Sequence, residues 1–369
     1  MGKFLKNFDA HSEYQTYING QDAILPNVSY CRDNNEVHYN PWVETKVIAK
    51  FNVTSTSEAT QIINNYATPD YIFSEIEIDG VVQPSVVNSY TFDTTGEHTV
   101  KYTLVDPTLF LGFGYCTNLI SISIPNSVTT IDESALELCT NLTSVTMSNN
   151  VTSIGSDAFL SCESLTNITI PDSVTTIGMA AFAGCTGLTS INIPNSVTSI
   201  GDSAFDGCSF TSITIPSSVT SIGFSPFLSC SGLTSITVDS NNPNYDSRNN
   251  CNAIIETSTN ALIQGCQNTI IPNSVTTIRM SAFCGCTDIT SITIPSGVTS
   301  IGSVAFKNCT GLTSINCLAT TAPTITANTF WNIKTGGTLT VPTGSTGYNT
   351  WMGTGNYYLG KYSWTKVEQ

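Results

Sequence analysis

The sequence predicts a mainly β protein, built as a solenoid of stacked units of about 23 residues and preceded by a small Ig-like β-sandwich and an N-terminal helical segment. Charged residues make up only 11% of the 369 residues, against about 25% in ordinary domains, while hydrophobic residues make up 40%. Short polar side chains replace the missing charge, which favours a β surface. An apolar residue, usually followed by proline, recurs at Ile124, Met147, Ile170, Ile193, Ile215, Val238, Ile271, Ile294 and Cys317.

One unit, Leu188–Cys208, shows the order of its elements. Leu188–Pro194 alternates apolar and polar residues, which predicts a strand with one buried face that ends at the proline. Asn195–Gly201 contains a second short strand. A single helical turn, of the 3₁₀ kind at its tightest, would then bring Ala204–Phe205 into the core. Because so small a unit cannot bury its apolar face alone, its copies must stack.

Most of the 13 cysteines follow the same period. We interpret them as small core residues stacked on their neighbours, because neighbouring units present parallel side chains that are poorly placed for disulfides. Cys284 and Cys286 form the only close pair, and no histidine follows residue 105, so we expect no metal site and no cofactor. A serine at Cys185 would cost about 1–3 kcal/mol if its hydroxyl found no partner, and alanine less. The periodic cysteines are Cys116, Cys139, Cys162, Cys185, Cys208, Cys230, Cys286 and Cys309.

The repeated string Thr-Ser-Ile-x-Ile-Pro-x-Ser-Val-Thr-x-Ile-Gly-x-x-Ala-Phe-x-x-Cys closely resembles the BspA-like leucine-rich-repeat family. The resemblance covers about residues 109–341 and repeats in register. It implies a leucine-rich-repeat solenoid that binds ligands, because members of this family commonly act as surface adhesins and ligand-binding proteins of gut bacteria, mucosal parasites and their phages. One unit, at 239–271, is expanded, and within it Asn252–Glu256 and Ala261–Gln264 predict two strands joined by a turn.

The flanks differ in composition from the repeats. Gly2–Asn19 predicts a short amphipathic helix, and Leu25–Pro41 resembles the leader of structural proteins of Bacteroides phages and related gut elements. An N-terminal cap or an ordinary linker is the alternative for this segment. We expect the helix to hold the protein to a larger assembly through an apolar stripe, which consists of Phe4, Phe8, Tyr14, Tyr17 and Ile18.

The predicted organisation has four parts: an assembly segment at 1–42, a sandwich that acts as a spacer at 43–105, the solenoid at 106–317 and an aromatic cap at 318–369. Alternating runs at Lys46–Val53, Ile72–Ile78 and His98–Leu104 predict the strands of the sandwich. Thr338–Val341 predicts a last strand, after which the aromatic residues would cover the open end of the solenoid. A minor alternative is that some of these aromatics form a sugar-stacking patch.

Several functions are disfavoured by what the sequence lacks. A net charge of −15 with only 12 basic residues cannot neutralise a phosphate backbone, so nucleic acid is not an expected partner. No apolar run is long enough for a membrane span, and no export signal is recognised near Met1. The three histidines lie outside the repeats and no phosphate-binding loop occurs, so we expect no enzyme.

The candidate ligand face lies on the solvent side of the first strand of each unit. Two columns of hydroxyl and amide side chains are expected there, because positions two residues apart on a strand share a face. Such side chains can both donate and accept hydrogen bonds, which suits a glycan or a protein edge, although a merely soluble β surface would look the same. The candidate residues are Ser144, Thr146, Asn167, Thr169, Ser190, Asn192, Ser212, Thr214, Ser235 and Thr237.

The sequence therefore predicts a non-enzymatic binding protein. The first hypothesis is a virion-associated fibre or receptor-binding protein of a gut phage, held to other virion proteins by residues 1–42 and bound to a glycan or protein of the host surface. The alternative is a cell-surface adhesin of a gut bacterium or mucosal protist, and a third hypothesis is a passive structural decoration. A homo-oligomer is compatible with each of them.

Overall fold

The computed structural model describes residues 30–33, 36–39, 46–64, 72–106 and 108–369. In this part of the chain the fold is mainly β, and its helices are two short 3₁₀ segments, η1 (Arg248–Asn250) and η2 (Leu359–Tyr362). Near the N-terminus, β1 (Tyr30–Asp33) pairs antiparallel with β2 (Glu36–Tyr39). None of the described helices has the length and hydropathy to cross a membrane. The helix predicted for Gly2–Asn19 falls outside the described residues.

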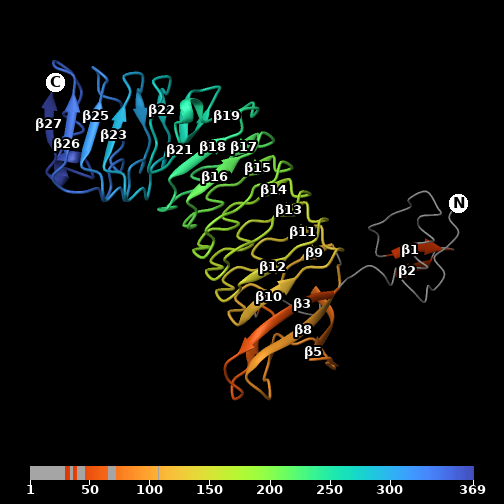
Figure 1. The fold of residues 1–369 in the computed structure, drawn as a ribbon. Coiled ribbons are helices and arrows are strands. Elements are labelled where there is room, and N and C mark those ends of the chain that lie inside the picture. The colour runs from red at the N-terminus through yellow and green to blue at the C-terminus, as the bar shows by residue number, and fades with distance from the viewer. Residues whose placement is uncertain (1–29, 34–35, 40–45, 65–71, 107) are drawn as a thin grey trace.

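The strands predicted before the repeats form an antiparallel sheet that is joined to the solenoid (Figure 1). Its strands are β3 (Lys46–Val53), β8 (Gly96–Leu104), β5 (Phe73–Ile78) and β6 (Val81–Val82), in that order. β3 pairs antiparallel with β10 (Leu119–Ser123), a strand of the solenoid, with Ala49 opposite Ile122. This module therefore covers one end of the solenoid. A separate two-stranded sheet joins β4 (Thr60–Gln61) to β7 (Ser89–Tyr90), and the Ig-like topology stays a prediction.

The repeats form two parallel ladders in register, which confirms the solenoid. The first ladder consists of the strands that precede the proline position of each unit, and it has three sections. The first section pairs β10 with β12 (Ser144–Thr146), and the second pairs β16 (Ser212–Ile215) with β18 (Ser235–Val238). The third contains β23 (Ser291–Ile294), β25 (Ser314–Cys317), β26 (Thr338–Val341) and β27 (Thr365–Glu368). The prediction that β26 is the last strand is wrong, because β27 continues the ladder with Leu339 opposite Lys366.

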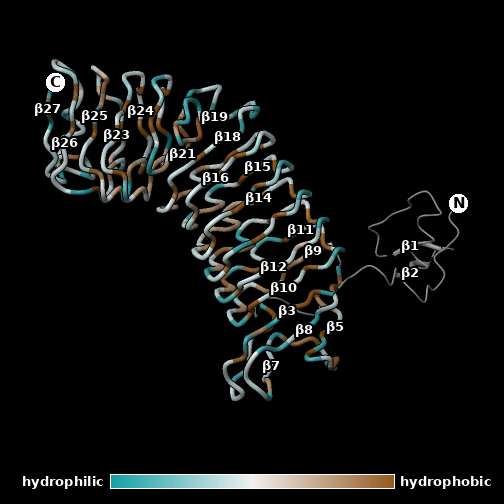
Figure 2. Tube along the Cα trace, viewed as in Figure 1, coloured by the Kyte–Doolittle hydropathy of each residue, from teal (hydrophilic) through white to brown (hydrophobic). Residues whose placement is uncertain are grey.

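The second ladder is made of two-residue strands, which carry the Thr/Ser-Ile pair of each unit in every strand but β9. Before the expanded unit they are β9 (Leu109–Phe110), β11 (Thr130–Ile131), β13 (Ser153–Ile154), β14 (Thr176–Ile177), β15 (Ser199–Ile200) and β17 (Ser221–Ile222). After it they are β22 (Thr277–Ile278) and β24 (Ser300–Ile301). Apolar and polar segments alternate along the turns of the solenoid (Figure 2).

No helix is assigned at Ala204–Phe205, where the sequence predicts a helical turn. The Asp206 amide donates to the Ser203 carbonyl oxygen at 3.0 Å, which closes a single turn, and Ser203 (φ 51°) and Gly207 (φ 70°) lie in the left-handed region, so no right-handed helix continues through them. The turn still buries both predicted side chains, and Phe205 stacks on Phe182 with ring centroids 5.6 Å apart and planes within 4°. The same stacking links Phe159, Phe182, Phe205 and Phe227 into one column, and Phe283, Phe306 and Phe330 into another.

The twelve cysteines from Cys116 to Cys317 are buried and free, as predicted for the periodic ones, and several of them also form hydrogen bonds. The thiol of Cys185 donates a hydrogen bond of 3.1 Å to the carbonyl oxygen of Phe159 in the preceding turn. Five other periodic cysteines repeat this contact with their own preceding turns: Cys139, Cys162, Cys208, Cys230 and Cys309. The column is therefore a ladder of thiol donors as well as an apolar stack.

This partner changes the expected result of substitution at Cys185. A serine hydroxyl can donate to the same carbonyl, so Cys185→Ser is expected to cost no more than about 1 kcal/mol and to match Cys185→Ala in urea unfolding. Burial raises the pKa of the Cys185 thiol to about 12. Native protein at pH 8 should therefore react slowly with a thiol reagent and react fully after unfolding. Fast labelling of the native protein would contradict this assignment.

The expanded unit divides the apolar core in two. Its hairpin joins β20 (Ala253–Glu256) to β21 (Ala261–Gly265), as predicted, and β19 (Tyr245–Asp246) pairs with β20. Ile254 and Ile263 pack into the core on the N-terminal side, whereas Ile255 and Leu262 pack into the core on the C-terminal side. Buried on both faces, the hairpin stands between two stacks of repeats, and the solenoid bends where it lies (Figure 1).

Candidate ligand-binding face

The structure places the two predicted polar columns on the surface. Nine of the ten candidate residues are exposed and Ser235 is half-buried, while the alternate side chains, such as Ile213 and Ile236, are buried. Where the first ladder is formed the columns are in register, with Ser212 opposite Ser235 and Thr214 opposite Thr237. They also continue beyond the predicted set through the last strands, at Thr338, Thr340 and Thr365. The sequence analysis did not include these residues, because the repeated motif is no longer recognisable after Cys317.

Hydrogen bonding distinguishes this face from a column of threonines along the second ladder, although both are rows of short polar residues in the sequence. Along the second ladder, Thr175 donates its hydroxyl to the carbonyl oxygen of Thr152, and Thr198 donates to that of Thr175, at 3.1 and 3.2 Å. Those hydroxyls serve the solenoid itself. The ten candidate side chains make no such bond to any described residue, so their hydroxyls and amides face solvent with their hydrogen-bonding capacity unused.

A polar hollow of about 440 Å³ adjoins the middle of the face. Asn192, one of the candidate residues, lines it together with Asp172, Asn195 and Ser196, and Ile193 and Pro194 supply an apolar floor. The Ser196 hydroxyl is buried and has no hydrogen-bond partner among the described residues. No strand is assigned to the first-ladder segments at 165–170 and 188–193, on either side of Asp172. The hollow therefore combines one carboxylate, two amides and a hydroxyl beside an apolar surface.

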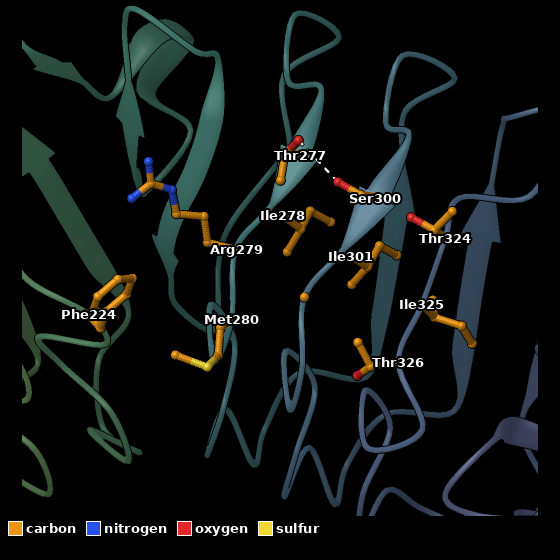
Figure 3. A pocket seen from close by; sticks show the side chains of 11 residues that line it. Phe224, Thr277, Ile278, Arg279, Met280, Ser300, Ile301, Thr324, Ile325 and Thr326 are labelled. Atoms are coloured by element: carbon orange, nitrogen blue, oxygen red, sulfur yellow. Dashed lines mark hydrogen bonds between the residues drawn. The ribbon is translucent and has the colours of Figure 1, made fainter.

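A second hollow, of about 560 Å³, opens at the bend of the solenoid. Phe224 lies on its N-terminal side and Met280 and Ile325 on its C-terminal side (Figure 3), and Phe224 is 60% exposed. Arg279 also lines it, but its guanidinium is held by Glu256 at 2.6 Å. This groove is mostly apolar, and sequence reasoning missed it because it exists only where the expanded unit separates the corners of two repeats.

The aromatic residues of the C-terminal part fall into two groups. Tyr348, Trp351 and Trp364 are buried, as expected of a cap, and each donates to a backbone carbonyl, those of Ala319, Pro323 and Lys334 respectively. Trp331 and Tyr357 stack on each other near the surface, with centroids 5.0 Å apart. The sequence could not separate these groups, because both belong to one aromatic-rich stretch.

The described residues show where the side chain of His98 lies and whether metal-ligating side chains gather. His98 is bound through Nδ1 to Asp79 at 2.6 Å and lies with Nε2 2.9 Å from the Thr94 carbonyl oxygen, in the N-terminal sheet and away from both hollows. The same residues contain no group of His, Cys, Asp or Glu side chains arranged to hold a metal ion. The predicted anchor residues Phe4, Phe8, Tyr14, Tyr17 and Ile18 fall outside the described residues.

Comparisons with known proteins agree with this architecture. The sequence model of the BspA type leucine-rich repeat region matches residues 110–234, 152–262 and 253–352. Among solved structures, a leucine-rich cell surface protein from Faecalibacterium prausnitzii is 29% identical, covering 69% of this chain and 74% of that one, with a TM-score of 0.54. A leucine-rich repeat protein from Eubacterium ventriosum is 23% identical, covering 66% of this chain and 76% of that one, with a TM-score of 0.39. No curated protein matches the chain.

Proposed function

This chain belongs to the family of BspA-type leucine-rich repeat proteins, and we propose that it is a non-enzymatic surface protein that binds a glycan or a protein through the polar face of its first ladder. The observation that carries the proposal is the set of solvent-facing hydroxyls and amides that recurs from turn to turn, in register where β16 pairs with β18. Each contact on such a face is weak, but an extended ligand could form several at once. The near absence of charge on this face suits a neutral, hydroxyl-rich partner.

The most specific part of the proposed site is the hollow beside Asn192. There the carboxylate of Asp172 can accept hydrogen bonds, and the side-chain amide of Asn195 can donate and accept them. Ile193 and Pro194 supply the apolar surface on which the less polar face of a sugar ring could rest. Pockets of this kind fix a ligand's orientation with a few polar groups.

A cell-surface location fits the proposal better than a virion. The similar protein from Faecalibacterium prausnitzii is a cell surface protein, and this likeness supports the same location here. The phage interpretation rested on the leader at Leu25–Pro41, and no comparison adds to it. We therefore propose an adhesin of a bacterial or protist surface, the alternative in the sequence-based reasoning, as the main function.

The proposal predicts that bulky side chains on the polar face weaken binding. The variant Thr169→Lys/Asn192→Lys/Thr214→Lys should lose at least about tenfold in affinity for immobilised mucin, because long side chains would keep an extended ligand off the strands. Three lysines placed on the N-terminal sheet module, at Thr54, Thr56 and Ala59, are the matched control and should leave binding unchanged. Equal binding by both variants, with native circular dichroism, would rule out the polar face.

A further inference from the structure

The two ends of the protein differ in charge. Residues 289–369 contain four lysines and one acidic side chain, Glu368, a net charge of +3, whereas residues 1–288 contain eight basic and 26 acidic side chains. The C-terminal part of a chain with a net charge of −15 is therefore basic. Such an asymmetry attracts anions to one end of the molecule.

Three of the four lysines at this end form no ion pair with a described carboxylate. Among the described side chains, the cations elsewhere in the protein are held in ion pairs, as Lys101 is by Glu77 and Arg248 by Asp246. Lys366 is likewise paired, with Glu368. The described cations without a carboxylate partner are Lys307, Lys334 and Lys361.

Two of these unpaired lysines flank the stack of Trp331 and the half-buried Tyr357. The Nζ of Lys307 lies 4.5 Å from the centroid of the Trp331 ring, and the Nζ of Lys361 lies 4.1 Å from that of Tyr357. Lys307 and Trp331 are neighbours because each follows the stacked phenylalanine of its turn, and η2 supplies Lys361. The four side chains form a platform of two rings between two ammonium groups.

The platform is not needed to close the solenoid. The buried cap already covers the last phenylalanine, since Trp351 packs on Phe330 with centroids 5.3 Å apart. Trp331 is 37% exposed, and its indole N–H, unlike those of Trp351 and Trp364, donates to no described residue. The lysines are held only by the faces of the rings, a weak attraction at an exposed site, so an incoming anion could draw them away and uncover the aromatic surface.

We propose that Lys307, Trp331, Tyr357 and Lys361 form a binding site for an acidic sugar, one whose carboxylate pairs with a lysine while its ring packs on Trp331 or Tyr357. A sugar fits better than an acidic peptide or a nucleic acid, because the platform offers two rings and two cations on a small area and no long basic track. This site lies apart from the polar face, so it goes beyond the proposed function and can fail independently of it.

The experiment measures binding of 3′-sialyllactose and of a glucuronic-acid oligosaccharide to the full chain by tryptophan fluorescence and calorimetry. At least one should bind, with lactose binding at least about tenfold more weakly, and affinity should fall severalfold when NaCl is raised from about 0.05 to 0.5 M. Of the other three tryptophans, Trp351 and Trp364 are buried and Trp42 falls outside the described residues, so the measurement is made in a Trp42→Phe background. There the fluorescence change should come from Trp331 and vanish when Trp331→Phe is added.

The variants separate this site from the polar face. Trp331→Ala and Lys361→Ala should each lower affinity for the acidic sugar at least about tenfold, whereas the Thr169/Asn192/Thr214 lysine variant should keep it. Lys50→Ala, which removes the same charge from the N-terminal sheet, is the matched control. The proposal is overturned if neither acidic sugar binds, if lactose or a poly-glutamate peptide binds as well as they do, or if the platform variants bind like wild type.

Discussion

Replacing Phe182 by alanine is expected to destabilise the protein by about 3–5 kcal/mol, the usual cost of removing a fully buried aromatic ring. Phe182 is wholly inaccessible and stacks on both neighbours, with centroids 5.0 Å from Phe159 and 5.6 Å from Phe205. Its loss would leave a cavity between turns that cannot close, because the second ladder, β13–β14–β15, fixes their spacing. Urea unfolding followed by circular dichroism should show the loss.

The matched control for this substitution is Phe224→Ala. Phe224 is 60% exposed at the rim of the bend groove, so its removal should change stability by no more than about 0.5 kcal/mol. The buried Trp351 and Trp364 belong to the other apolar core, beyond the expanded unit. In Phe182→Ala, circular dichroism should therefore begin to change at a lower urea concentration than the fluorescence of these tryptophans. Equal stability of the two alanine variants would contradict the role of the phenylalanine column.

Gly201→Ala is expected to destabilise the solenoid by about 1–3 kcal/mol through a steric overlap between successive turns. A Cβ at Gly201 would lie 2.5 Å from the carbonyl carbon of Gly178 and from the amide nitrogen of Met179. These are backbone atoms of the preceding turn, so relief would require the turns to separate and would weaken the hydrogen bond from the Gly201 amide to Ile177. Thermal and urea unfolding measure the effect.

Gly355→Ala tests whether the loss comes from the overlap rather than from the change of residue type. Gly355 is exposed, has no positive φ, and a Cβ there would meet nothing within 4 Å. We expect this variant to match the wild type within about 0.5 kcal/mol. If Gly201→Ala were equally silent, the close approach of the turns at Gly201 would be wrong.

The repeat itself was readable from the sequence because stacking makes one local pattern recur. The period of Ile193 and its equivalents predicted the parallel ladders, and the alternating runs predicted β3, β5, β8, β20 and β21 close to their observed bounds. Two local details were not readable. Ser203 has a left-handed backbone conformation, which the presence of a serine does not predict. β27 lies in the C-terminal part of the chain, where the repeated motif is no longer recognisable.

The candidate site likewise has features that the sequence predicted and features that only the structure shows. From the sequence alone, the columns at Asn192 and at Thr175 are equivalent rows of short polar residues. Only the tertiary structure shows that the Thr175 hydroxyl is used by the Thr152 carbonyl while the Asn192 side chain faces solvent beside a hollow. The hydrogen-bond partners belong to the preceding turn, so the assignment depends on how turns lie against each other.

The sequence by itself determined a β-solenoid of about 23-residue units with a buried phenylalanine and a free, buried cysteine in most units, because each of these follows from the local period. The tertiary structure alone decided where the rod bends, which hydroxyls stay available, and that Lys307, Trp331, Tyr357 and Lys361 meet at one end. Those features arise from contacts between turns and between the last turn and the cap, over separations that no local pattern encodes.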